Sequence, residues 1–355
     1  MNALIGEHAA QLPMIWAAIL AVAVAMYVLL DGFDLGVGML FQLFPAEADR
    51  DKMMNSVAPF WDGNGTWLVL GGGGLWVAFP RAYAIIMPAL YLPIIVMLLA
   101  LILRGVSFEF RWIAKPNHRI WDFAFSFGST LAAFCQGVVL GGLLQGIHVA
   151  NGAFAGGSFD WATPFALFCG LCVVVGYALL GACWLVMKTE HDLQARARKL
   201  AKPILFAMLA AIGLISIWTP LMLQRIYERW FSLPNFWYLS SLPLATMVVA
   251  WLCWRGLQKE RAVQPFLSAI GLFLLAYIGL LISNVPYLVP PMPAMDGGNA
   301  GNAGAVFGLT IADAAAAPAS QQFLLIGTVF LLPIIIGYTV FVYWVFRGKV
   351  GEGYH

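Results

Sequence analysis

Two aspartates lie inside the first apolar stretch of the chain, in the segment LLDGFDLGVGML, residues 29–40. A carboxylate at the centre of a bilayer costs about 2.5–3.5 kcal/mol on insertion scales, so an ionisable residue kept at that depth usually has a function. Asp31 and Asp34 are three residues apart, which places both side chains on one face of a helix. Two carboxylates this close do not ionise together easily, so we expect one of them to retain a proton.

The composition of the chain indicates its class. It has 355 residues, of which 62% are hydrophobic and only 10% are charged. Soluble proteins carry about a quarter charged residues, and uncharged stretches of membrane-spanning length recur here throughout. The sequence therefore predicts an all-α integral membrane protein. The net charge of +2, without a basic stripe interleaved with aromatic residues, gives no indication of nucleic-acid binding.

Hydrophobic runs predict nine transmembrane helices in a single polytopic domain, 1–355. Helices 1–4 are expected within 1–150, helices 5–8 within 160–285, and helix 9 within 321–346. The connection 286–320 contains PPMPAMDGGNAGNAG and is predicted to be an irregular outer loop. The nine runs lie near 14–36, 55–79, 83–103, 122–146, 163–187, 203–223, 239–255, 263–285 and 322–346.

The distribution of basic residues predicts the orientation. With nine spans the two termini lie on opposite faces, and 16 of the 19 Lys and Arg residues fall on the face that holds the C-terminus. The other face keeps only Arg81, Arg225 and Arg229. Because basic loops stay on the cytoplasmic side, the N-terminus is expected outside and the C-terminus inside.

The second span brings a third carboxylate to the depth of the first two. The apolar run 66–79 has 14 residues, short of the roughly 20 that a helix needs to cross, so it must extend back through Trp61 and Asp62. Asp31 follows Met14 by 17 residues, and Asp62 precedes the outer end of its span by the same number. At 1.5 Å per residue both lie about 26 Å from the outer face.

Arg104 ends the third predicted span at a similar level, so two or three carboxylates and a guanidinium are expected to meet near the cytoplasmic edge of the hydrocarbon. A carboxyl that changes its protonation beside a route to cytoplasmic water is what proton uptake requires. The alternative is that these acids cap helix ends, bind backbone amides or pair with Arg104. The sequence leaves both interpretations open.

The histidines and cysteines indicate no metal site. All five histidines, at positions 8, 118, 148, 191 and 355, fall in predicted loops or tails, whereas a haem within a membrane is usually held by histidines from spanning helices. Any haem is therefore expected in another chain. Cys169 and Cys172 have CxxC spacing but lie inside an apolar span without a second pair, which favours core packing.

The sequence resembles subunit II of the cytochrome bd quinol oxidases, in order along nearly the whole chain. The segments that carry the resemblance are DGFDLGVGML (31–40), NSVAPFWDGNGTW (55–67), FPRAYA (79–84), LILRGVSFEFR (101–111), GSTLAAFCQGVVLGGLLQG (128–146), IADAAAAPASQQF (311–323) and YWVFRGKV (343–350). Its short loops and the C-terminal FRGKV look most like the cyanide-insensitive branch.

The resemblance implies two four-helix bundles and a peripheral ninth helix, paired with a haem-bearing subunit I as a pseudo-symmetric heterodimer in the bacterial inner membrane. It places haems b558, b595 and d in that partner, which oxidises quinol at the periplasmic face and reduces dioxygen to water with cytoplasmic protons. A structural quinone in this chain and a small single-helix accessory subunit occur in some members.

For individual residues, the resemblance implies a proton pathway. Asp62 matches the proposed entrance, Trp61 is its motif neighbour, and Asp31 and Asp34 match the acids of the first helix. Arg104 and Glu109 match a polar patch at the inner end of the third helix. No catalytic residue is expected in this chain.

One segment, Ala294–Gly304, departs from the family pattern as an insertion in the outer loop. Two other functions compete with proton conduction in an oxidase. A proton-coupled transporter would need a polar site at mid-membrane within this chain, and a purely architectural subunit would use the acids as caps.

Overall fold

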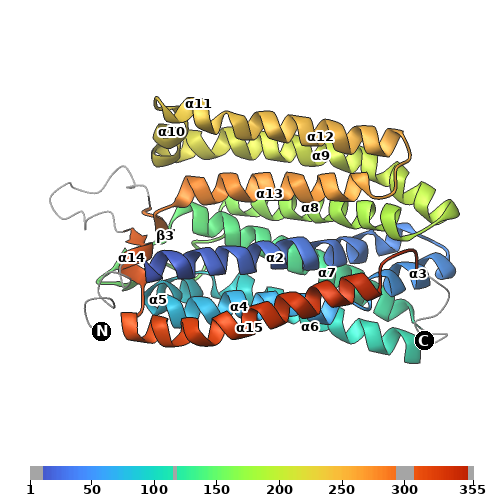
Figure 1. Cartoon of the computed structure of the whole chain (residues 1–355), viewed down its shortest axis with the longest axis horizontal. Coiled ribbons are helices and arrows are strands. Elements are labelled where there is room, and N and C mark those ends of the chain that lie inside the picture. Colours follow the sequence, from blue (N-terminus) through green and yellow to red (C-terminus); the bar gives the residue numbers. More distant parts are fainter. Residues whose placement is uncertain (1–10, 115–117, 293–307, 351–355) are drawn as a thin grey trace.

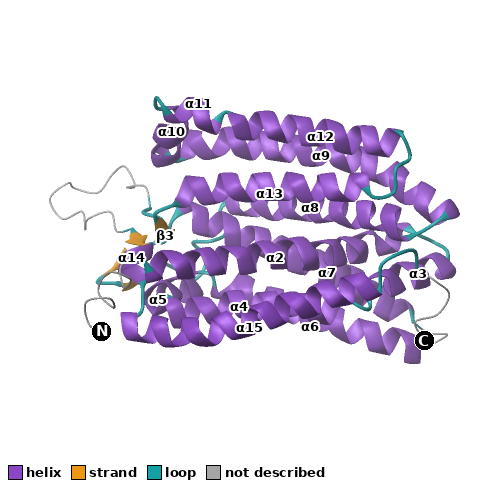
Figure 2. Cartoon of the chain, viewed as in Figure 1, coloured by secondary structure: helices purple, strands orange, loops and turns teal. Residues whose placement is uncertain are grey.

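The computed structural model describes residues 11–114, 118–292 and 308–350. Long helices run side by side along the longest axis, and the short strands gather at one end (Figures 1 and 2). The long helices are α2 (Leu12–Leu40), α4 (Trp61–Ala78), α6 (Tyr91–Ile113), α7 (Arg119–Gln145), α8 (Pro164–Lys188), α9 (His191–Met222), α12 (Ser241–Gln258), α13 (Gln264–Asn284) and α15 (Pro318–Val345). Shorter elements are η1 (Phe41–Leu43), α3 (Glu47–Val57), α5 (Pro80–Ala89), β1 (Val149–Ala150), β2 (Ala153–Phe154), α10 (Gln224–Phe231), α11 (Asn235–Leu239), β3 (Tyr287–Val289), β4 (Leu309–Thr310) and α14 (Ile311–Ala314).

Eight helical segments in the described part of the chain are long and apolar enough to cross a membrane. The second predicted span is the exception: α4 has 18 residues, but Asp62, Asn64 and its glycines make it less apolar than the other long helices. The predicted span 55–79 is not one helix: α3 ends at Val57 and α4 begins at Trp61, so the helix includes Trp61 and Asp62, as the sequence predicted, but begins later than residue 55. It lies antiparallel to α2, since the Asn64 side chain bonds to the Leu30 carbonyl while Gly74 lies against Leu20.

The third predicted span, 83–103, is wrong as a single helix. The chain forms α5 and then α6, with a break at Leu90. Pro93 explains the break, because it has no N–H to bond the carbonyl four residues earlier, at Ala89. As a result α6 continues to Ile113, and Arg104 lies within the helix and not at its end.

The helices are arranged in layers (Figure 1). α9 and α12 form one edge, α8 and α13 the next layer, α2 and α7 the centre, and α4, α6 and α15 the other edge. The centre is packed through glycines, because a Cβ added to Gly36 of α2 would overlap the Tyr177 carbonyl oxygen of α8. By contrast α15 is peripheral, with Gln321 as its one buried residue among those described.

The connection 286–320 is more ordered than the sequence predicted. β3 and β4 pair antiparallel, with Tyr287 opposite Thr310, and α14 follows directly. A hydrogen bond attaches the segment to the end of α4, from the Ala316 N–H to the Ala78 carbonyl at 2.9 Å. The predicted insertion 294–304 lies outside the described residues.

The three arginines predicted on the outer face all bond to backbone carbonyls. Arg81 donates to the Asp313 oxygen at 2.8 Å, Arg225 to Leu144 at 2.7 Å and Arg229 to Ile282 at 2.8 Å. Leu144 and Ile282 lie in the last turns of α7 and α13, where the carbonyls have no partner within the helix. A positive charge at a helix C-terminus is stabilising, so Arg225 and Arg229 serve as caps.

Candidate functional site

Asp31 of α2 and Arg104 of α6 form a buried ion pair within the set of helices α2 to α7, the first half of the molecule. The Arg104 Nη1 donates to Asp31 Oδ1 at 2.7 Å, and the two residues are 4% and 0% exposed. α6 approaches closely because Gly128 of α7 lies against it, where a Cβ would be 2.8 Å from the Ala100 carbonyl oxygen. A buried charge is tolerated only when it is paired, so Asp31 and Arg104 depend on each other.

Asp34 has a neutral partner. Its Oδ2 accepts a hydrogen bond at 2.7 Å from the Asn64 side chain of α4, which also donates to the Leu30 carbonyl at 3.2 Å. Tyr343 of α15 donates its hydroxyl to the Asn64 Oδ1 at 3.2 Å. Asn64 therefore joins the peripheral helix to the carboxylate, with its amide group held from both sides.

Several polar atoms of this cluster have no hydrogen-bond partner among the described residues. They are Asp31 Oδ2, Asp34 Oδ1 and Arg104 Nε, each buried. Buried polar atoms are nearly always bonded to protein or water, so these atoms mark places where a proton or a water molecule would be stabilised. One oxygen on each carboxyl group is held by a fixed partner, Arg104 or Asn64, and the other has no hydrogen bond to a described residue.

A chain of hydrogen bonds leads away from Asp31 through three further side chains. Tyr177 of α8 donates to the Gln136 Oε1 at 2.7 Å, and the Gln136 Nε2 donates to the Tyr27 hydroxyl at 2.9 Å. Tyr27, one turn before Asp31 on α2, interacts with the Asp31 carboxylate. The order of donors points toward Asp31, so the chain stabilises its negative charge.

The other predicted site residues lie outside this cluster. Asp62 starts α4 near the level of Asp34, as predicted, but its side chain is exposed, so the expected meeting with Asp31 and Asp34 is wrong. Trp61 stacks on Phe108 of α6, with ring centroids 4.9 Å apart. Glu109 is exposed one turn beyond Arg104. Depth along a helix follows from residue counting, whereas rotation about its axis depends on packing.

Sequence reasoning missed the neutral members of the network: Tyr27, Asn64, Gln136, Tyr177 and Tyr343. Some had a signal, since Tyr27 is four residues before Asp31 and Asn64 belongs to the WDGN segment. Gln136 is a lone amide in an apolar run, which could have been noted. Nothing in the sequence distinguishes Tyr177 or Tyr343 from the other tyrosines.

A second ion-pair cluster joins α3, α6 and α7 near the C-terminal end of α6. Arg111, with a fully buried side chain, bonds Asp51 and Asp122 at 2.6 Å each, and Arg50 lies 3.3 Å from Asp122. His118 lies 3.7 Å from the same carboxylate. Asp122 faces two guanidinium groups, whereas Asp31 faces one and Asp34 bonds a neutral amide, so we interpret this second cluster as structural.

The described residues of this chain do not fit a haem site. His118 is at the start of α7, His148 is in a loop and His191 starts α9, while His8 and His355 lie outside the described residues. In the described ranges no three His, Cys, Asp or Glu side chains converge as metal ligands would. Cys169 packs in an apolar cluster with Leu144 and Phe165, as the core interpretation predicts.

Comparisons with known proteins agree with this geometry. The family model described as cytochrome bd terminal oxidase subunit II matches residues 12–346. The chain is 30% identical to the cytochrome bd ubiquinol oxidase subunit 2 of Bacillus subtilis, covering 97% of this chain and 98% of that protein. It is 27% identical to the cytochrome bd-I ubiquinol oxidase subunit 2 of Escherichia coli, covering 96% and 95%.

The fold agrees as well. The chain is similar to a chain in the structure of bd oxidase from Geobacillus thermodenitrificans, with a TM-score of 0.74 and 17% sequence identity, over 95% of this chain and 99% of that one. This likeness covers the layered helices that enclose Asp31, Asp34 and Arg104. The family match over 12–346 therefore places this multi-pass membrane chain in the cytochrome bd terminal oxidase subunit II family, whose members are subunits of a respiratory oxidoreductase complex.

Proposed function

We propose that this chain is the subunit of a bd-type ubiquinol oxidase that carries no haem and helps conduct cytoplasmic protons to the haems of subunit I. The observation that carries the proposal is the buried cluster of Asp31, Asp34 and Arg104, with one unpartnered oxygen on each carboxyl group. The relatives named as subunit 2 of a ubiquinol oxidase support the reaction, quinol oxidation coupled to reduction of dioxygen to water.

The orientation in the proposal is N-terminus periplasmic and C-terminus cytoplasmic in the bacterial inner membrane. The excess of basic residues at one end supports this orientation. The three basic residues at the other end, Arg81, Arg225 and Arg229, are each hydrogen-bonded to a backbone carbonyl. The first described helix begins at one end of the molecule and α15 finishes at the other, which requires an odd number of crossings (Figure 1). Counting α4 as the ninth span meets this requirement.

The proposed proton route has an exposed entrance and a buried relay. Asp62 and Glu109 are exposed beyond the buried cluster toward the inner end, where they meet cytoplasmic water. From there a proton passes to Asp34 and Asp31, whose free oxygens accept it, while Arg104 stabilises the ionised form. The Tyr177–Gln136–Tyr27 chain orients Asp31 from the opposite side.

The cofactors of the complex belong to the partner in this proposal. Haems b558, b595 and d in subunit I supply the redox chemistry, which the placement of histidines at helix ends and loops in this chain supports. A structural quinone in this chain and a single-helix accessory subunit are carried forward as proposals without assigned contacts. The proposal also keeps the two four-helix bundles, helices 1–4 and helices 5–8, with α15 as the peripheral ninth helix.

Two measurements test the proposal. Expressed without its partner, the chain should purify free of haem, and tightly bound haem would contradict the assignment of the cofactors. In the complex, Asp34→Asn keeps the shape of the side chain but removes its titration, so quinol-driven oxygen consumption should fall at least about tenfold. The haem absorption spectrum should stay unchanged. Full turnover in this variant would favour an architectural role.

The same variant separates the proposal from a proton-coupled transporter. A transporter would move its own substrate across vesicles that contain this chain alone, with a dependence on the proton gradient. The complex proposed here should show no such transport and should lose proton uptake in step with oxygen consumption.

A further inference from the structure

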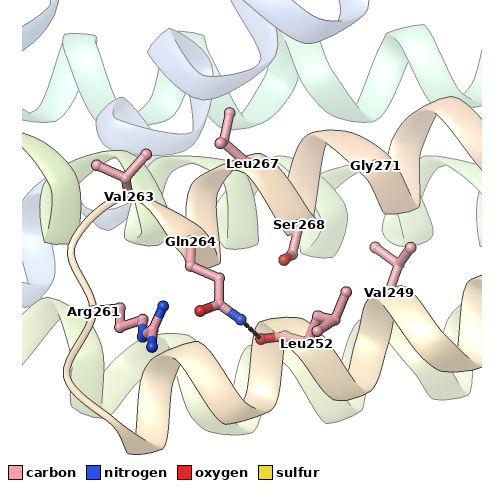
Figure 3. Close-up of a pocket in the computed structure, with 8 residues that line it drawn as sticks. All are labelled: Val249, Leu252, Arg261, Val263, Gln264, Leu267, Ser268 and Gly271. Atoms are coloured by element: carbon pink, nitrogen blue, oxygen red, sulfur yellow. Dashed lines mark hydrogen bonds between the residues drawn. The ribbon is translucent and has the colours of Figure 1, made fainter.

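A groove of about 550 Å³ lies between α12 and α13, near the loop that joins them (Figure 3). Its walls are mainly apolar side chains, Val249 and Leu252 from α12 and Leu267 from α13. In the proposed orientation the joining loop is cytoplasmic, so the groove opens at the level of the inner-leaflet headgroups. Neither α12 nor α13 belongs to the proton route.

The groove has a defined length. At its far end Gly271 lies against Val249, where an added Cβ would be 3.1 Å from Val249 Cγ1, so the helices close on each other there. Near the loop the Gln264 side chain bridges the helices by donating to the Leu252 carbonyl at 2.9 Å (Figure 3). From Gln264 to Gly271 the helix rises about 10 Å, which suits the first part of an acyl chain.

Arg261 is the one cation that lines the groove, and its guanidinium has no hydrogen bond or ion pair with any described residue. The neighbouring charged residues Glu260 and Arg255 have other partners. Glu260 lies 3.4 Å from Arg198, and Arg255 lies over the Trp251 ring at 5.2 Å. Because the adjacent acid already has a partner, Arg261 presents an unneutralised positive charge at the mouth of an apolar groove.

Ser268 adds a polar group within the groove. It is 8% exposed, and its hydroxyl bonds to no described residue. Several helical serines and threonines of this chain bond the carbonyl four residues back, as Thr246 does to Leu242 at 2.9 Å, although Ser129, like Ser268, does not. The view in Figure 3 places the Ser268 hydroxyl between the two helices, on the side where Arg261 lies.

We propose that this groove binds one anionic phospholipid of the inner leaflet. Its phosphate meets Arg261, an ester carbonyl accepts from the Ser268 hydroxyl, and one acyl chain lies along Leu252 and Leu267. The charge of Arg261 decides the class of lipid. A net-negative headgroup is attracted to the guanidinium, whereas in a zwitterionic headgroup the positive group largely cancels the attraction of the phosphate. The lipid site shares no residue with the proposed proton route and rests only on the proposed orientation.

The test uses the complete oxidase complex, delipidated in detergent and mixed with phosphatidylglycerol or phosphatidylcholine of identical acyl chains. Native mass spectrometry counts the retained lipids. The wild type should retain one phosphatidylglycerol that Arg261→Gln binds about fivefold more weakly. Arg119→Gln, which changes an exposed arginine at the start of α7, should behave as the wild type. Ser268→Ala should weaken both lipids equally.

Photocrosslinking of the wild type checks the location without any variant. A phosphatidylglycerol with a diazirine on its acyl chain should label peptides of α12 and α13. Equal retention by the wild type and Arg261→Gln would overturn the proposal, as would labelling confined to other helices. Equal binding of phosphatidylcholine, or a quinone found in the groove of the purified complex, would overturn it as well.

Discussion

Helices α2 to α7 and helices α8 to α13 enclose different kinds of core. The first set buries Asp31, Asp34 and Asp122, and these are all the buried carboxylates of the described residues. The second set buries thiols and aromatic rings, including Cys183, Cys253 and Trp184, and its buried cations Lys188 and Arg198 lie at the end of α8 and in the first turns of α9. Helices of similar length and hydropathy thus enclose a cluster of buried carboxylates on one side and a mainly apolar core on the other.

The difference shows what each half contributes. An apolar core forms from any well-packed set of side chains, whereas a buried charge costs stability unless a partner is held in place. Among the described residues only the first half buries carboxylates, which points to a function for that half. The second half supplies Tyr177 and the glycine contacts that keep α2 in position.

The largest loss of stability is expected for Arg104→Met, with Arg198→Met as the comparison in the second half. Removing Arg104 leaves the Asp31 carboxylate buried without its partner, which should lower the free energy of unfolding by about 3–5 kcal/mol. Arg198 faces Glu260, whose side chain is 75% exposed, so its loss should cost about 1 kcal/mol or less. Thermal unfolding of the two complexes measures the difference. Equal losses would remove the distinction between the halves.

The next effect concerns the amides Gln136 and Gln264. Gln136→Leu leaves the Tyr27 and Tyr177 hydroxyls without their shared partner, which should cost about 1–3 kcal/mol and slow turnover. Gln264→Leu removes one bond to the Leu252 carbonyl and should leave turnover unchanged. Unfolding and oxygen consumption, measured on both variants, separate a role in the relay from simple packing. Unchanged turnover in Gln136→Leu would disconnect the chain from the relay.

Asp62→Asn should slow oxygen consumption by a few-fold while leaving haem content and thermal stability intact, because its side chain is exposed and has no structural partner among the described residues. Asp192→Asn provides the matched control, an exposed acid in the first turn of α9. Oxygen electrode traces and haem spectra of the two variants make the comparison. Loss of haem in Asp62→Asn alone would make this acid structural.

The smallest effect is expected at two tyrosines that each make one hydrogen bond. Tyr343→Phe removes the bond to Asn64, and Tyr277→Phe removes the bond to the Ala21 carbonyl. Each should lower the free energy of unfolding by about 1 kcal/mol. Only Tyr343→Phe should also reduce turnover, since Asn64 orients Asp34. If Tyr277→Phe slows turnover equally, the relay extends into the second half.

Much of the architecture was predictable from local pattern. Seven of the nine predicted spans coincide with long apolar helices, because hydropathy over a span-length window is a property of the chain alone. The inclusion of Trp61 and Asp62 in α4 followed from the length that a crossing requires, although the helix begins later than the predicted residue 55. The break at Leu90 was not predicted, although Pro93 indicated it. The strands β3 and β4 and helix α14 within 286–320 were not predicted either, because the glycine-rich stretch of the same segment favoured an irregular loop.

The sequence by itself determined the class of the protein, the depth of each acid along its helix and the family, because composition, residue spacing and motif order are all written in the chain. Only the tertiary structure decided which acids meet. Asp31 finds Arg104, Asp34 finds Asn64, and Asp62 at a similar depth faces outward. The physical reason is that rotation about a helix axis is set by contacts with other helices, as where Gly36 and Gly128 let α8 and α6 approach.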